Sequence, residues 1–340
     1  MTSFRFFLSL AAAILLGALL TTGSGLNAQQ PPQAADAAAP SVLPPIIDDG
    51  ASSTRPEPEE TAPPESSKTA LDAGSGDSLE LTQEQEEQLR QITKVIYEVP
   101  PTHSGGGDAE IVEIPLSLFE ALSQIQNSAD RLAAVESYWS LRSSIAHLNI
   151  EIHIRESAEK AAGVLEKAAI DTPDFQALMA VYRVYLSSAD ARIAQLRVEI
   201  REGQIDLMRK TQRSTERGWP IPSSTPWYGN YTLRSEAAQS RSFELASEAI
   251  LIPEKIRAGY ASGFSLGSPE NLFTPEISTF ERIDDGYLYL KTLENKRQAA
   301  LGYVRVLESL NDSIARYVAA YSPSIDSRVF VTCLIGNEEE

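Results

Sequence analysis

The chain has 340 residues, a formal net charge of −18 at pH 7 and a single cysteine, Cys333. Because the acidity comes without a basic stripe, it excludes nucleic acid as a partner and gives no attraction to anionic lipid headgroups. One cysteine also excludes an intrachain disulfide, so packing or partners must hold the fold. We interpret Cys333 as a small buried hydrophobe rather than a reactive thiol.

Residues 1–28 have the layout of a secretory signal peptide. Arg5 gives a positive start, residues 6–20 form an apolar run, and small and polar residues lead up to Ala28. We predict cleavage after Ala28. The apolar run of roughly 15 residues is shorter than the about 20 that span a membrane, so a retained anchor is the less favoured alternative.

Residues 29–80 are rich in proline, alanine, serine and acid, and they carry −8 of the net charge. With almost no aromatic residues, this tract buries too little apolar surface to offset its ordering entropy. We predict a disordered acidic spacer. A dedicated ligand for another protein is the alternative.

Helix signals begin at Thr82, which forms a capping box with Gln85 and starts a helix that stops at Pro100. The glycines at 105–107 predict a hinge, because no lysine follows them as in a phosphate-binding loop. Residues 111–114 are a short extended candidate. A second capping box follows at Ser117 and Glu120.

The central helix is predicted at 130–169. Its apolar side chains recur at spacings of 3 and 4, the a and d positions of a coiled coil, at Tyr138, Leu141, Ile145, Leu148 and Ile152. Asp171, Thr172 and Pro173 supply a stop, a cap and a first-turn proline. A second helix at about 175–217 then forms an antiparallel hairpin with the first, because the connection is short.

The connection at 218–229 is rich in proline and predicted to be irregular. With its surroundings it carries four aromatic residues: Trp219, Trp227, Tyr228 and Tyr231. Aromatic rings in a loop of an exported protein are typical of membrane interfaces, which gives a possible contact with the outer membrane. The alternative, which we favour, is that they pack back onto the helices.

A third helix is predicted at about 235–260, kinked at Pro253. The last helix has the clearest 3–4 spacing of the chain, at Ala300, Tyr303, Leu307, Leu310, Ile314, Tyr317 and Tyr321. The predicted fold class is therefore all-α, with two long antiparallel coiled-coil hairpins. We predict a helical domain at 81–323 and a C-terminal tail at 324–340.

Candidate chemistry is sparse. His147 and Glu151 lie one helical turn apart, but His153 falls on a different face and spacing places no further metal ligand. The acidic pair Asp284 and Asp285 is interpreted as solvated surface, and no catalytic motif is present. We therefore predict no catalytic residue, metal or cofactor, and a protein that is not an enzyme.

Several strings, in their order along the chain, resemble the outer-membrane efflux family typified by TolC. They are residues 116–122 (LSLFEAL), 137–146 (SYWSLRSSIA), 219–222 (WPIP) with 228–231 (YGNY), and 307–317 (LESLNDSIARY). The resemblance is to divergent members, with the helical periplasmic part and without recognisable barrel strands. It implies two repeats that each give a helical hairpin to a periplasmic barrel, a trimer of chains, and a place in the periplasm or at the outer membrane.

The expected function is transport or export as part of an oligomeric helical assembly, formed by self-association or with other envelope proteins. The surface expected to mediate it includes Trp139, Ala146 and Ile150, which lie off the main seam of the central helix. A monomeric periplasmic scaffold or interaction protein without transport is the alternative. Exposed apolar stripes on the folded chain favour assembly, and helices polar on every outward face favour the scaffold.

Overall fold

The structure, a computed structural model, describes residues 81–99, 113–167, 172–214, 216, 218–234, 237–273, 280, 282–322 and 326–335. All of them belong to one compact unit, Leu79–Glu340. The expected export signal, the acidic spacer and the hinge at 105–107 lie outside the described residues. Helices dominate the described part, which confirms the all-α class.

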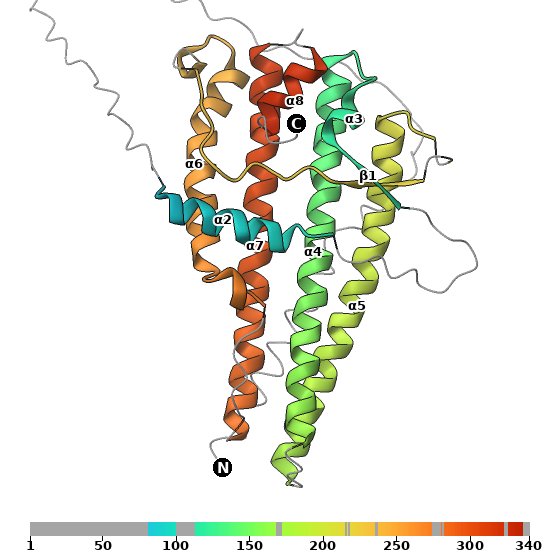
Figure 1. Cartoon of the computed structure of the whole chain (residues 1–340), viewed down its shortest axis with the longest axis vertical. Helices are drawn as coiled ribbons and strands as arrows, with labels where there is room; N and C mark the ends of the chain where they lie inside the picture. The colour runs from blue at the N-terminus through green and yellow to red at the C-terminus, as the bar shows by residue number, and fades with distance from the viewer. Residues whose placement is uncertain are drawn as a thin grey trace, which may run out of the picture. The chain divides into compact units, whose positions relative to one another are not determined.

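Four long helices form the body of this unit: α4 (Ser128–Lys167), α5 (Pro173–Lys210), α6 (Phe243–Ser265) and α7 (Ile283–Tyr321). They pack side by side in the order α6, α7, α4, α5 (Figure 1). This order leaves α5 at one edge of the row and α6 at the other.

Side-chain contacts give the direction of each helix. Between α4 and α5, Ser137 bonds to Asp206, whereas Arg155, further along α4, bonds to the earlier residue Asp190. The α4–α7 pairs behave in the same way, with Glu136 near Arg316 and Glu151 near Arg297. Each helix therefore runs antiparallel to its neighbour in the row, as Figure 1 also shows for α6 and α7.

The predicted caps are confirmed. Thr82 and Ser117 each complete a capping box, at the start of α2 (Gln83–Ile96) and α3 (Leu118–Leu122). Thr172 caps α5 and Pro173 occupies its first turn. These ends were readable because the capping partners lie three residues apart in sequence.

Two helix boundaries differ clearly from the prediction, and the start of a third helix had not been predicted. The second helix, expected to reach 217, ends at Lys210, because Gln212 adopts a left-handed φ of 54° and the amide of Arg213 bonds to the carbonyl of Met208. Helix α6 begins at Phe243 rather than 235, where the Ser242 hydroxyl caps it. Helix α7 begins at Ile283, well before the first residue of its regular apolar spacing.

Two short strands are present, the first overlapping the extended candidate at 111–114 and the second inside the connection expected to be irregular. β1 (Glu113–Leu116) and β2 (Trp219–Pro222) pair in parallel, with Glu113 opposite Trp219 and Leu116 opposite Pro222. β2 contacts both α4 and α5, so the pair lies against the helical row. The α2 helix crosses α6 and α7 (Figure 1).

Part of the segment expected to be a C-terminal tail is helical. Residues 327–335 form α8 (Ser327–Ile335), and Phe330, Val331 and Leu334 are buried in the core. Cys333 is partly buried and packs against the same core, in keeping with its interpretation as a small hydrophobe. No helix of the described residues combines the length and the hydropathy that a membrane crossing needs.

Gly263 tests the packing of α2 across α6. A Cβ at this position would overlap Leu89 of α2 and lie 3.0 Å from Cε2 of Tyr303 on α7. We expect Gly263→Ala to lower the free energy of unfolding in urea by about 1–2 kcal/mol, the usual cost of overpacking.

Gly302→Ala is the matched control for this test, because a Cβ there meets nothing within 4 Å in the middle of α7. This variant should be more stable than the unchanged chain by about 0.5–1 kcal/mol through helix propensity. Equal stabilisation by both substitutions would contradict the close approach of α2 to α6.

Candidate functional site

The predicted packing residues of α4 and α7 form the core. Tyr138, Leu141, Ile145 and Leu148 belong to one hydrophobic cluster together with Leu310, Ile314 and Tyr317, while Tyr303 and Leu307 belong to a second. All nine are buried. They therefore hold one chain together and do not form an exposed surface.

The expectation of an exposed second stripe on α4 is wrong. Trp139 is 2 % exposed, and Ala146 and Ile150 are fully buried. α4 is an inner helix of the row, covered by α7 on one side and α5 on the other, and α2 also contacts it. The single chain thus buries the residues that we expected a second chain to cover.

The loop aromatics pack back onto the helices, which is the alternative we favoured. Trp227 and Tyr231 meet edge to face with ring centres 5.8 Å apart, and Tyr231 in turn meets Tyr317 of α7. Tyr228 packs against both clusters. Trp219 lies under the guanidinium of Arg201, 4.2 Å from its ring centre.

Polar side chains of α4 hold the segments that cross the row. The Tyr138 hydroxyl donates to the carbonyl of Leu116 and accepts from the amide of Ser224, at 2.9 and 2.8 Å. Arg142 donates to the carbonyl of Tyr97 at the end of α2, and to that of Ser224. Asn149 donates to two further carbonyls at the end of α2.

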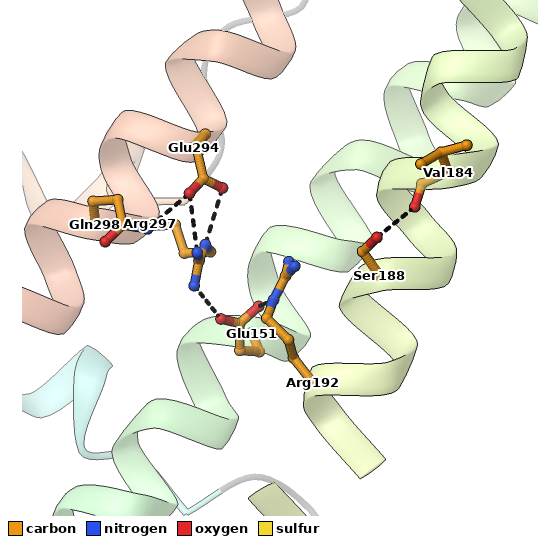
Figure 2. Close-up of polar contacts among 7 residues, drawn as sticks. All are labelled: Glu151, Val184, Ser188, Arg192, Glu294, Arg297 and Gln298. Carbon is orange, nitrogen blue, oxygen red and sulfur yellow. Dashed lines mark hydrogen bonds and ion pairs between the residues drawn. The ribbon is translucent and has the colours of Figure 1, made fainter. Parts of the chain in front are cut away.

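A buried charge network joins α4, α5 and α7 (Figure 2). The carboxylate of Glu151, with 3 % of its side chain exposed, accepts from Arg297 at 2.7 Å and from Arg192 at 2.9 Å. Arg297 also donates to Glu294 on its own helix. Each buried charge therefore has a partner of opposite sign, which its desolvation requires.

Replacing Glu151 should be costly. In Glu151→Gln the two arginines lose their shared carboxylate in a buried site, so we expect the free energy of unfolding to fall by about 3–5 kcal/mol. Glu159→Gln is the matched control, because Glu159 pairs with Arg155 at 2.8 Å but is 59 % exposed. It should cost less than about 1 kcal/mol. Similar losses for both variants in urea unfolding would contradict the buried network.

The histidines do not converge on a ligand set. Burial, together with Arg305 and Arg297, lowers the pKa of His147 to about 4. His153 instead stacks on Phe273 at 5.1 Å, and Glu151 is occupied by its arginines. Within the described part of the chain, no group of three or more His, Cys, Asp or Glu side chains is placed to hold a metal ion.

The outer edge of α5 carries an apolar stripe that the sequence analysis missed. Val184, Ala191, Val198 and Ile205 recur every seven residues and are all exposed, Val198 to 59 %. This period keeps the four on one side of a helix. This seven-residue period is visible in the sequence, between the apolar residues of α5 that are buried, such as Phe175, Leu178 and Tyr182. We call these four residues the α5 stripe.

The opposite edge of the row is also apolar. On α6, Phe243 is 85 % exposed, Ile250 61 % and Leu251 43 %. Phe243 and Ile250 are again seven residues apart. We call these three the α6 stripe, and the two stripes together are the candidate interaction surface.

An acidic pair on α7 lies among other charged groups. Burial and the neighbouring Asp312 raise the pKa of Glu308 to about 7. Burial, followed by Glu136 of α4, raises the pKa of Asp312 to about 6. The charged groups that act on the two carboxylates come from three helices: Glu136 of α4, Glu248 and Lys255 of α6, and Arg305 and Arg316 of α7.

The raised pKa values predict a stability that depends on pH. In the unfolded chain Glu308 and Asp312 titrate near pH 4.5 and 3.8, so between about pH 4 and pH 7 the folded chain holds more protons. Their contribution to stability is present at pH 4 and is lost as pH rises to about 7.

The double variant Glu308→Gln, Asp312→Asn lacks this loss. The melting temperature of the variant minus that of the unchanged chain should increase by about 2–4 °C from pH 4 to pH 8. This change corresponds to about 1 kcal/mol after screening by solvent. A difference in melting temperature that stays constant across this range would contradict the raised pKa values.

Comparisons with protein-family models, with curated proteins and with solved structures gave no match to this chain.

Proposed function

We propose that this protein is an exported subunit of a helical duct, in which copies of the chain join edge to edge and solute passes through the assembly. The observation that carries the proposal is the pair of exposed apolar stripes on the two edge helices. Soluble proteins rarely expose such patches unless a partner covers them. The resemblance to the TolC-type family adds the periplasm or outer membrane as the location and three as the number of chains.

The order and direction of the helices support a closed ring. The helices α6, α7, α4 and α5 alternate in direction, so α5 of one copy is antiparallel to α6 of the next. The contact joins two different surfaces, and such a head-to-tail contact closes into a ring when its rotation allows. Two antiparallel helical hairpins from each chain would then continue one alternating wall.

One end of each stripe lies at the same height along the row. Asp206 of α5 is level with Ser137 of α4, to which it bonds at 2.6 Å. Next to Ser137 in sequence, Glu136 pairs with Arg316 of α7. Lys255 of α6 bonds to Ser313, one turn below Arg316. Because α6 and α7 are antiparallel, Leu251 lies one turn from Lys255 in the same direction as Arg316 lies from Ser313. Leu251 is therefore at the same height along the helices as Ile205. Rotation about an axis parallel to the helices preserves this height, so the two residues of neighbouring copies stay level.

Charges beside the stripes are complementary. Arg209 follows Ile205 by one turn on α5 and is exposed. Glu244 lies in the first turn of α6, next to Phe243, and is also exposed. Opposite charges at the rim of an apolar contact favour the correct pairing of surfaces.

One face of the row is suited to line a duct. Arg142 of α4 points to the end of α2 and to the connection at 218–229. Ser140 and Ser144 each lie two residues from Arg142, a rotation of about 200°, so they face away from α2 and this connection. Between α4 and α5 this polar face forms a groove lined also by Glu199, Glu202 and Asp206. In the proposed duct this face points inward.

Cysteine pairing tests the contact. In a Cys333→Ser background we expect Ile205→Cys with Ile250→Cys to form disulfides between chains on mild oxidation, giving dimer and trimer bands and no larger species. The pair Ile205→Cys with Leu288→Cys is the matched control. Both positions are exposed, but Leu288 lies in the first turns of α7, far from Ile205 along the length of the helices. A trimer band in the control but not in the test pair would overturn the proposed edge contact.

Light scattering of the purified chain, with and without detergent, gives the second readout. We expect a trimer, and we expect Ile205→Glu to convert it to a folded monomer. Val329→Glu, at an exposed position of α8 away from both edge helices, should leave the trimer intact. A monomer under all conditions would reject assembly and favour the periplasmic scaffold.

A further inference from the structure

A cavity of about 390 Å³ lies where four separate parts of the chain meet. Its wall is made by the start of α2, the connector at 225–230, α6 and the end of α8. The side chains that matter below are Glu86, Trp227, Tyr228 and Tyr260. Three of these four are aromatic, and this size falls in the range of small-molecule sites.

Hydrogen bonds fix the aromatic wall. The amide of Trp227 donates to the side chain of Asn311 at 2.8 Å, and Asn311 donates back to the carbonyl of Trp227 at 3.0 Å. The indole N–H donates to the carbonyl of Gly229, and the Tyr260 hydroxyl donates to Asn230. Since the connector is held in this way, the cavity needs little rearrangement to receive a ligand.

The charge in the cavity is negative. Among the described residues that line it, Glu86 is the only acidic or basic side chain, and within the described part of the chain its carboxylate has no ion-pair partner. Burial, with a further effect of Glu86, raises the pKa of Tyr260 to about 12, so this hydroxyl stays neutral. An anionic ligand would meet repulsion, whereas a cation would meet a carboxylate and aromatic rings.

We propose that this cavity binds a small organic ammonium ion, held between the rings of Trp227 and Tyr228 and the carboxylate of Glu86. Aromatic rings attract ammonium groups through their negative faces, and desolvation strengthens the attraction. The carboxylate adds a charge-assisted contact. This site is independent of the proposed duct, because none of its lining residues belongs to the α5 or α6 stripe.

Choline is a suitable probe, because 3,3-dimethylbutan-1-ol has the same shape without the charge. The protein is labelled with ¹⁵N-tryptophan and titrated in phosphate buffer, and the three indole signals are followed by NMR. We expect choline to shift the signal of Trp227 in a saturable way and to leave Trp139 unmoved. The alcohol should bind at least about tenfold more weakly.

Two variants locate the charge. Glu86→Gln should weaken choline binding about tenfold and leave the weak binding of the alcohol unchanged. Glu84→Gln is the matched control, because Glu84 lies in the same first turn of α2 and does not line the cavity. Equal affinity for choline and the alcohol would overturn the ammonium site, as would the absence of any shift at about 10 mM choline, well above a Kd of ~1 mM.

Vesicles of phosphatidylcholine present the same ammonium group from a lipid surface. A shift of the Trp227 signal by vesicles as well as by choline assigns the site to lipid headgroups, and a shift by choline alone assigns it to free amines. Repeating the titration with Ile205→Glu separates this proposal from the duct. Binding that persists in a monomer supports the site whatever becomes of the assembly.

Discussion

The architecture depends on satisfying the backbone groups of the segments that cross the helical row. These segments have few hydrogen bonds of their own, and a buried carbonyl or amide without a partner costs free energy. Helix α4 supplies the partners: Tyr138 bonds to β1 and to the connector after β2, and Arg142 and Asn149 bond to the carbonyls that end α2. The central helix is thus both a packing surface and the polar anchor of one face.

This anchoring makes the two faces of the row different. The face with α2 and the connectors is covered and contains the aromatic cavity, whereas the other face presents serine and acidic residues between α4 and α5. The edges remain apolar. A single chain therefore leaves one polar surface and two apolar edges uncovered, and a head-to-tail contact between copies would bury both edges, in a ring when its rotation closes.

Much of the local structure could be predicted from sequence, and the long-range contacts could not. The caps at Thr82, Ser117 and Thr172 and the core positions of α4 and α7 follow from spacings of three and four residues. The length of α7, the β1–β2 pair and the core role of α8 depend on partners far away in the chain. Trp139, Ala146 and Ile150 were misplaced for the same reason, because periodicity shows that a face is apolar but not which element covers it. The α5 stripe could have been predicted, because its seven-residue period is visible in the sequence between the buried apolar residues of the same helix.

The two proposed sites have different relations to a duct. If the polar face between α4 and α5 lines the interior, then α2, the connectors and the cavity with Trp227 and Glu86 lie on the outside. A cation bound there would not be on the path of a solute through the duct. It would instead sit among α2, α6 and α8, and it would be positioned to stabilise their packing over the row. The acidic pair of α7, Glu308 and Asp312, lies at the α4–α6–α7 contact, so α6 borders both the cavity and the acidic pair.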